Sequence, residues 1–386
     1  MDWRALLAAA DGPPGLAALR KAAGARFLKR GLPSSRDEGW RYTDTRFFAK
    51  QELELMRSAI EIDAPAGVRV RPLGEAVDAA QPFLADEAEQ GHPFRLLNSA
   101  LLRDGLLVEV ADGVTVEGPL HLTITTGRGI ALPRLLVAVG ENARLTLVER
   151  YRAGAGAGAC LPVTQLAVGA GSRVEHLRVH HGRDDVHIGC VEVRQQRDSL
   201  VTSHMLTFGG QLVRNDLAFH LLGSGAEARL NGLYLADSEQ HVDNHTTVEH
   251  AVPHCDSRET YRGILGGKAS AVFNGRVHVH PDAQRTDAQQ SNQNLLLTDD
   301  AIIHTKPELE IYADDVKCTH GATVGQLDRE ALFYLRSRGL AHDEARRMLV
   351  DSFAAEIVRR IGDEPLRDEL VEAVVARLPG MLAEAA

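Results

Sequence analysis

Cys318 and His320 have the residue types and the spacing of a metal-ligand pair. In a β-strand, residues i and i+2 project to the same face, so the thiol and the imidazole can reach the same ion. A thiolate is a soft ligand and an imidazole a borderline one, and together they suit iron or zinc. Two ligands do not close a site, although Glu310, Asp314 and Asp315 are near enough in sequence to complete it. A packed thiol beside a hydrogen-bonded imidazole is the alternative interpretation.

The histidines in the middle of the chain offer a different kind of metal site. Of the 17 histidines, His278 and His280 lie on one face of a predicted strand. Others occur nearby in sequence, namely His180, His181, His241, His245, His250 and His254. Strand histidines are often only solvated, and no His-Glu-x-x-His set is present. A stable metal-dependent enzyme that uses these histidines is the alternative to a labile site at Cys318 and His320.

Motifs for other chemistries are incomplete. The glycine-rich stretches 154–158 and 266–268 lack the spacing of a dinucleotide site or a P-loop. Nothing near Cys318 resembles a nucleophile elbow or a cysteine-protease signature. We therefore predict that the chain itself binds no nucleotide and performs no nucleophilic catalysis.

Composition narrows the classes of partner and compartment. The formal net charge of −10 argues against nucleic-acid binding, which needs Lys and Arg to neutralise phosphates. The four cysteines, Cys160, Cys190, Cys255 and Cys318, are widely spaced and fit neither a disulfide framework nor a structural zinc module. We find no signal peptide and no apolar run that could span a membrane, so a reducing cytoplasm is the expected location.

The candidate ligands and docking residues are held by three regions of the chain that differ in their apolar patterns. Residues 1–95 have apolar residues at three-to-four spacing, which predicts an N-terminal helical domain. Residues 96–325 consist of short runs of Val, Leu and Ile separated by Gly, as in Leu106–Val110, and are typical of strands. Residues 326–386 are again helical, with Asp328 as the N-cap of the first helix. The predicted plan is a long β-region between two helical domains.

A repeated segment of the β-region predicts its architecture. A Gly turn that leads into a strand occurs three times, at offsets of 29 and 56 residues, in Gly140–Leu145, Gly169–Val174 and Gly225–Leu230. A second pair of segments, Leu230–Leu235 and Phe273–His278, repeats an Asn-Gly followed by a strand. Turns that recur every 28 residues or so are typical of a stacked solenoid. A β-sandwich whose hairpin turns coincide by chance is the alternative.

Five blocks of sequence also carry a resemblance to a known family. They are Gly31–Thr43, Phe273–Val277, Ala283–Ala288, Leu332–Gly339 and Lys306–Gly325, the last with the sequence KPELEIYADDVKCTHGATVG. With these blocks the chain resembles the SufB/SufD family of iron-sulfur cluster assembly scaffolds. Lys317–Gly325 follows the SufD form, and Ser291–Asn294 lacks the cysteine that SufB-like members have there.

The resemblance implies a fold, partners and a cargo. The fold is a right-handed parallel β-helix flanked by N-terminal and C-terminal helical domains. The function is that of a non-catalytic scaffold that helps to build and transfer nascent clusters and supports iron acquisition. A SufB-like subunit would pair through the β-helix, and a SufC-like ABC-type ATPase would bind the C-terminal helices. A transient iron-sulfur cluster at the subunit interface would take His320 and Cys318 as ligands. Flavin involvement and a homodimer of the isolated chain remain open.

The C-terminal helices contain the residues expected to dock the ATPase. These residues are Leu332, Phe333, Tyr334, Arg336 and Arg338. Phe333 has a core position as its alternative. A third hypothesis for the whole chain is a purely structural adaptor that binds the ATPase and in which no residue touches iron.

Overall fold

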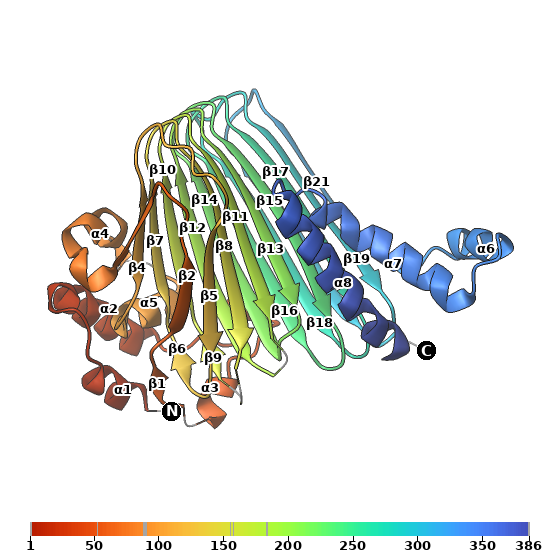
Figure 1. The fold of residues 1–386 in the computed structure, drawn as a ribbon, viewed down its shortest axis with the longest axis horizontal. Helices are drawn as coiled ribbons and strands as arrows, with labels where there is room; N and C mark the ends of the chain where they lie inside the picture. The colour runs from red at the N-terminus through yellow and green to blue at the C-terminus, as the bar shows by residue number, and fades with distance from the viewer. Residues whose placement is uncertain are drawn as a thin grey trace.

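The centre of the molecule is a parallel β-solenoid (Figure 1). The computed structural model describes residues 2–51, 53–87, 91–154, 156, 158–182 and 184–384; the alanines of the predicted 154–158 glycine loop lie outside these residues. Strands alternate along the chain between two sheets, called sheet A and sheet B below, so that each coil adds one strand to each. The predicted solenoid with flanking helices is confirmed.

Sheet A contains the even-numbered strands of the later coils. Its main path is β3 (Val68–Pro72), β4 (Leu106–Val110), β7 (Arg134–Val139), β10 (Val163–Val168), β12 (Val186–Gln195), β14 (Leu212–Leu221), β16 (His241–His250), β18 (Ser270–Val279) and β20 (Ile302–Ile311). Three short strands, β1 (Leu55–Met56), β6 (Ile130–Ala131) and β9 (Ala159–Cys160), pair beside this path.

Sheet B lies opposite. It contains β2 (Ala59–Asp63), β5 (Leu120–Thr126), β8 (Arg144–Ala153), β11 (Arg173–His181), β13 (Leu200–Phe208), β15 (Glu227–Ala236), β17 (Asp256–Leu265), β19 (Asp287–Leu296) and β21 (Lys317–Gly325). Buried apolar side chains from the inner faces of both sheets form one continuous core between them.

The sequence repeats match the coils in part. Arg144 lies beside Arg173, as the 29-residue offset predicts. The third copy is displaced, because Glu227 rather than Arg229 occupies the position two coils beyond Arg173. The Asn-Gly segments belong to different sheets, β15 and β18, so they are not stacked on each other. Gly232 has a packing role instead: a Cβ there would lie 2.1 Å from the Tyr261 ring.

The two ends of the solenoid differ. At the N-terminal end, β2 pairs antiparallel with β5, and β3 pairs antiparallel with β4. These strands lie within residues 1–95, which the apolar pattern predicts to be helical. At the C-terminal end, β20 and β21 have no outer neighbour within the described part of the chain. The outer edges of β2 and β3 are likewise unpaired within the described residues, so the two ends differ in strand direction, antiparallel at the N-terminal end and parallel at the C-terminal end.

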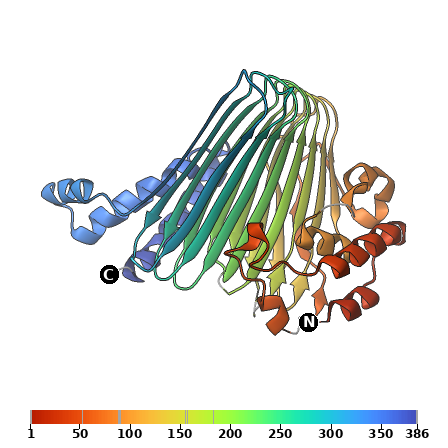
Figure 2. The ribbon, with the colours of Figure 1, turned by 180° about the vertical axis from the view of Figure 1, so that it is seen from behind.

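Helices cover the outer faces of the sheets. The N-terminal helices α1 (Trp3–Ala9), α2 (Ala17–Arg30), α3 (Phe47–Lys50), α4 (Val77–Leu84) and α5 (Pro93–Ala100) lie at the N-terminal part of the molecule, where α2 and α5 pack on sheet A (Figure 2). The helices α7 (His342–Val358) and α8 (Glu364–Glu384) pack on sheet B. Short 3-10 turns occur at Pro14–Leu16, Glu38–Trp40 and Leu73–Glu75. None of the helices in the described residues is both long and apolar enough to cross a membrane.

Candidate functional site

Cys318 and His320 lie on β21, the last strand of sheet B. Their register partners on β19 are Ala288 and Gln290, both of which are buried in the solenoid interior. Cys318 and His320 therefore share the inward-facing side of the strand, as the i, i+2 spacing predicts. Cys318 is half-buried against the apolar core, whereas His320 is exposed because no further coil covers it. The pair forms part of an open surface at the end of the stack.

The nearby carboxylates do not complete this ligand pair. Glu310 lies on the outer face of β20, where its Oε2 accepts from His278 Nδ1 at 2.8 Å. Asp315 lies in the exposed β20–β21 turn, 3.7 Å from Arg285. Burial and the charge of Asp287 raise the pKa of the Cys318 thiol, so an incoming metal would displace a proton. Among the described residues the site therefore has two candidate ligands, Cys318 and His320.

Apolar side chains surround the open end. Ile302, Ile311, Tyr312 and Val324 belong to β20, to the turn that follows it and to β21, and all four are exposed. Unpaired strand edges with exposed apolar side chains are surfaces on which another chain can add strands. This end of the solenoid has the character of an interface.

Several histidines of the middle region contact carboxylates. His278 and His280 lie on one side, as predicted; the adjacent Val277 and Val279 point into the core. The Nε2 of His280 contacts Glu249 Oε1 at 2.6 Å, and Glu249 also contacts His220 at 2.6 Å. Among the described residues, no group of three ligand atoms gathers at these histidines. The geometry thus provides no closed ligand set for the metal-dependent enzyme hypothesis.

The first C-terminal helix, α6 (Arg329–Ser337), projects from the body of the molecule (Figures 1 and 2). Asp328 caps it as predicted, accepting from the amides of Glu330 and Ala331. The helix has no buried residue, and Phe333 is 73% exposed. Of the other predicted docking residues, Leu332 is half-buried, while Tyr334, Arg336 and Arg338 are exposed. Phe333 is therefore not a core residue of this chain.

The solenoid interior contains a buried polar network that the sequence analysis did not predict. Glu149 accepts from His176 Nε2 at 2.7 Å, from the Tyr151 hydroxyl at 2.6 Å and from the Thr164 hydroxyl at 2.9 Å. It also forms an ion pair with Arg178 at 3.2 Å. Burial alone would raise the pKa of Glu149, but Arg178 and His176 lower it to about 2. Alternate residues of each strand face the core. The sequence would reveal such buried polar residues only if it were known which alternate set of each strand faces inward.

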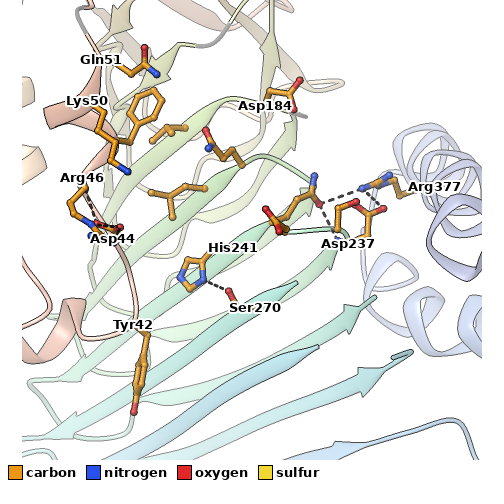
Figure 3. A pocket seen from close by; sticks show the side chains of 17 residues that line it. Tyr42, Asp44, Arg46, Lys50, Gln51, Asp184, Asp237, His241, Ser270 and Arg377 are labelled. Atoms are coloured by element: carbon orange, nitrogen blue, oxygen red, sulfur yellow. Dashed lines mark hydrogen bonds and ion pairs between the residues drawn. The ribbon is translucent and has the colours of Figure 1, made fainter. Parts of the chain in front are cut away.

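A large cleft lies beside the turns that end the coils of sheet A (Figure 3). It has a volume of about 1180 Å³, and its walls come from Tyr42–Gln51, from turns of the solenoid and from Arg377 on α8. Its charges largely neutralise each other: Asp44 pairs with Arg46, and Asp237 pairs with Arg377 at 2.8 Å. The cleft therefore has no strong excess of positive or negative charge that would attract a charged ligand.

A second unpredicted group contains His92, Cys190 and Asp216, whose ligand atoms lie within 4.8 Å of one another. His92 comes from the N-terminus of α5, and Cys190 and Asp216 are register partners on β12 and β14. Residues this far apart in sequence carry no local motif. The register of the solenoid aligns Cys190 with Asp216, and the packing of α5 on sheet A brings His92 to them.

Comparisons with known proteins agree with the fold. The chain matches the family model described as SUF system FeS cluster assembly, SufBD core domain, over residues 122–353, more than half of its length. That region runs from β5 to α7 and includes Cys318 and His320.

Relatives align over most of the chain. The iron-sulfur cluster assembly protein SufD of Escherichia coli (strain K12) is 29% identical over 92% of this chain and 91% of its own length. A SufBD family protein of Synechocystis is 34% identical over 76% of this chain and 68% of its own length. A SufBD family protein of Mycobacterium bovis is 31% identical, with coverages of 89% and 88%.

Proposed function

Because the chain belongs to the SufBD family of SUF-system iron-sulfur cluster assembly proteins, we propose that it is a non-catalytic scaffold subunit which holds part of a nascent cluster at the open end of its solenoid. The iron and sulfide are cargo that passes through the complex. Its four cysteines are free, which suits a reducing cytoplasm.

The observation that supports this proposal is the half-site on β21. Cys318 and His320 face the same side of an edge strand, and no third ligand among the described residues joins them. A stable cluster needs about four ligands, so the remainder must come from another subunit. The free edges of β20 and β21 give a SufB-like subunit a place to add its own strands. Ligands from both chains would then meet at the seam.

The exposed helix α6 supports a second contact. Its aromatic residues Phe333 and Tyr334 and its basic residues Arg336 and Arg338 point to solvent. Aromatic and arginine side chains are enriched at protein interfaces. We assign this helix to the docking of a SufC-like ABC-type ATPase, which would supply the nucleotide site of the complex.

The ligand role is tested in the complete complex. The chain is co-expressed with a SufB-like subunit and a SufC-like ATPase, and iron, sulfide and visible absorption are measured anaerobically. His320→Ala should leave the complex assembled but reduce cluster formation at least about tenfold. Cys318→Ser separates a ligand from a packed thiol, because a packed thiol would affect only stability. His342→Ala, at the exposed start of α7, is the matched control.

Cluster formation at the unmutated rate in the His320→Ala complex would reject the ligand role. The docking of the ATPase is tested separately by Arg336→Glu with Arg338→Glu, which should reduce co-purification of the ATPase without lowering the stability of the chain. Unchanged co-purification would remove these arginines from the interface and favour another surface.

A further inference from the structure

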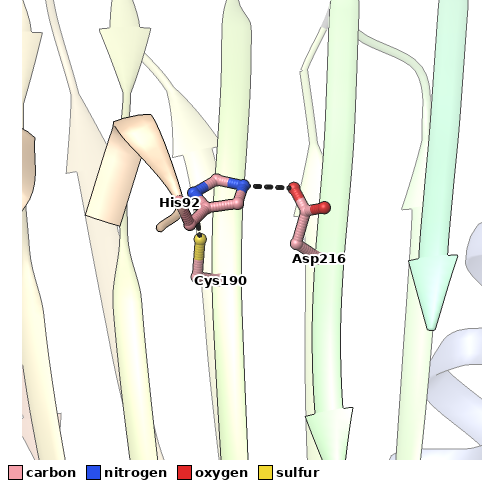
Figure 4. A group of neighbouring side chains, drawn as sticks. All are labelled: His92, Cys190 and Asp216. Carbon is pink, nitrogen blue, oxygen red and sulfur yellow. Dashed lines mark hydrogen bonds and ion pairs between the residues drawn. The ribbon is translucent and has the colours of Figure 1, made fainter. Parts of the chain in front are cut away.

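His92 lies across two neighbouring strands of sheet A (Figure 4). Its Nδ1 is 3.5 Å from the Sγ of Cys190, and its Nε2 is 3.1 Å from the Oδ2 of Asp216. Cys190 and Asp216 are register partners on β12 and β14. A thiol, an imidazole and a carboxylate thus form a chain in which each ring nitrogen has a different partner.

Several contacts hold this arrangement. Arg214 donates to both oxygens of Asp216, each at 2.8 Å, and its guanidinium lies 3.7 Å from the centre of the Trp40 ring. The backbone N–H of Arg95 donates to His92 Nδ1 at 3.3 Å, because His92 is the N-cap of α5. Arg214 therefore holds the carboxylate of Asp216, and the Arg95 amide holds the imidazole of His92. The thiol of Cys190 is the last group in this series of contacts.

A metal ion fits this geometry poorly. An ion placed between Cys190 and the near nitrogen of His92 would not reach Asp216, which contacts the far nitrogen. Both carboxylate oxygens of Asp216 already accept from Arg214. The arrangement instead has the form of an activated nucleophile: a nucleophilic side chain, a base in contact with it, and a third group that orients the base.

We propose that Cys190 is a peroxide-reactive cysteine, with His92 as its base and Asp216 as the positioning residue. The property goes beyond the proposed function and does not depend on it. His92 takes the thiol proton, and the thiolate sulfur attacks one oxygen of hydrogen peroxide. An S–O bond forms and the O–O bond breaks, so the sulfur is oxidised and the peroxide is reduced. The departing hydroxide takes the proton from the His92 imidazolium, which leaves a sulfenic acid, neutral His92 and water.

Charge and access agree with this assignment. Burial by itself would lower the pKa of His92, but the charges of Cys190 and Asp216 raise it to about 10. Both neighbours therefore favour the uptake of a proton by His92, which is the step that the proposal assigns to it. Cys190 is 6% exposed, while the side chains of His92 and Asp216 are 23% and 16% exposed. Because Cys190 is nearly buried, a small neutral reagent such as hydrogen peroxide suits it better than a bulky electrophile.

The other cysteines of the chain are internal references. Burial raises the pKa of Cys160, of Cys255 and of Cys318. Cys318 is more exposed than Cys190. Exposure and activation therefore predict opposite orders in which peroxide oxidises the two thiols. If access alone decided the rate, Cys318 would be oxidised first. If the His92 and Asp216 contacts decide it, Cys190 is first.

The test treats the reduced full chain with hydrogen peroxide at about pH 6 and about pH 8. Remaining thiols are alkylated after denaturation and quantified separately for each cysteine by mass spectrometry. Cys190 should react at least about tenfold faster than Cys318, with a rate that changes less than about twofold between the two pH values. An unactivated thiol would slow roughly 80-fold over this range, because its thiolate fraction falls with pH. Faster oxidation of Cys318 would overturn the proposal.

Matched variants separate activation from folding. His92→Asn removes the base but keeps a good N-cap, and it should restore the pH dependence of an ordinary thiol. Asp216→Asn should slow Cys190 at the lower pH. Asp243→Asn removes another carboxylate partner of Arg214 that does not touch His92, and it should leave the rate unchanged. Equal effects of the two Asp variants would reject Asp216 as a positioning residue.

Metal binding is the remaining outcome of the test. Zinc is titrated into the wild-type chain and into Cys190→Ser after chelation. One equivalent of zinc that binds only the wild type and protects Cys190 from peroxide would overturn the nucleophile assignment in favour of a metal site. Absence of such binding, together with the expected rates, supports it. Neither result bears on cluster formation at Cys318 and His320.

Discussion

Glu149 is a single residue whose removal would leave several buried groups unpaired. It is fully buried and contacts His176, Tyr151, Thr164 and Arg178. Glu149→Ala should therefore destabilise the chain by about 3–5 kcal/mol, because Arg178 keeps a buried charge without its partner. Urea unfolding of the two proteins measures the difference. Glu141→Ala on the surface should change stability by less than about 0.5 kcal/mol, and a similarly small effect at Glu149 would contradict the network.

Glu259 gives a pH-dependent prediction. Burial raises its pKa from 4.5 to about 7, so the folded chain binds a proton more tightly than the unfolded chain does. Stability contributed by this group is present below about pH 4.5 and is lost as the pH rises towards 7. Glu259→Gln should be more stable than wild type near pH 8, by up to about 3 kcal/mol, and nearly equal to it near pH 4.5. Gln290, which donates to Glu259 Oε2 at 2.9 Å, keeps an acceptor in the variant.

Urea titrations of the wild type and Glu259→Gln at both pH values decide this point. A difference in stability that is the same at the two pH values would show that the substitution acts through packing. A Gln variant that is less stable near pH 8 would contradict the sign.

At the scale of residues, the sequence predicts what is local. The shared face of Cys318 and His320 follows from the two-residue period of a strand. The position of Glu310 does not, because it depends on which parity of β20 faces inward. His92 and Cys190 are 98 residues apart in sequence, and their meeting depends on where α5 packs on sheet A. No pattern within a short window contains that information.

The edge of β21 is the element on which association with a second subunit depends. Lys317 donates its amide to the carbonyl of Thr286, directly before β19. The backbone amides of odd-numbered residues of β21 therefore point to β19, and those of even-numbered residues point to the free edge. Ala322→Pro should remove only an edge donor, change stability by less than about 1 kcal/mol and weaken co-purification with a SufB-like subunit. Thr319→Pro is the matched variant on the bonded side and should destabilise the chain itself.

Normal co-purification of the Ala322→Pro chain would show that a partner does not extend the sheet through β21. If both proline variants lost equal stability, the assignment of free and bonded positions would be wrong. Unfolding in urea and pull-down from co-expression give the two readouts independently.

Elements are predicted well where their own period is strong. Leu106–Val110 is β4 without any change of bounds, and Asp328 caps α6. The strands β2 and β3 were missed within residues 1–95, although Val68-Arg69-Val70-Arg71 has the alternation of a strand. They pair antiparallel with the first coil and are not part of the repeating coils, so no sequence repeat indicates where they pair.

At the scale of the molecule, the repeats predict stacking but not the exact register. From Arg144 to Arg173 one coil spans 29 residues, whereas from Arg173 to Leu200 it spans 27. The shorter coils explain why the third Gly turn is displaced by two residues from the predicted stack. A displacement of two keeps every side chain on its own face, so the core tolerates it.

The difference between the two ends of the solenoid predicts how the isolated chain behaves. The N-terminal end finishes in the antiparallel strands β2 and β3, whereas the C-terminal end finishes in the parallel strands β20 and β21, beside which Ile311 and Tyr312 are exposed. Without a partner, two copies should pair through their open ends in a concentration-dependent homodimer that sedimentation velocity detects. The substitutions Ile311→Lys and Tyr312→Lys add charges at this edge and should weaken the dimer at least about tenfold, or about 1.4 kcal/mol.

Ile62→Lys is the control at the opposite end, since Ile62 is an exposed apolar residue of β2. It should leave the dimer unchanged. Equal weakening by Ile62→Lys would place the contact elsewhere, and a chain that stays monomeric at every concentration would mean that the open edge needs the complementary surface of a different subunit. Adding a SufB-like subunit should convert the homodimer into a heterodimer, because both compete for the same two edges.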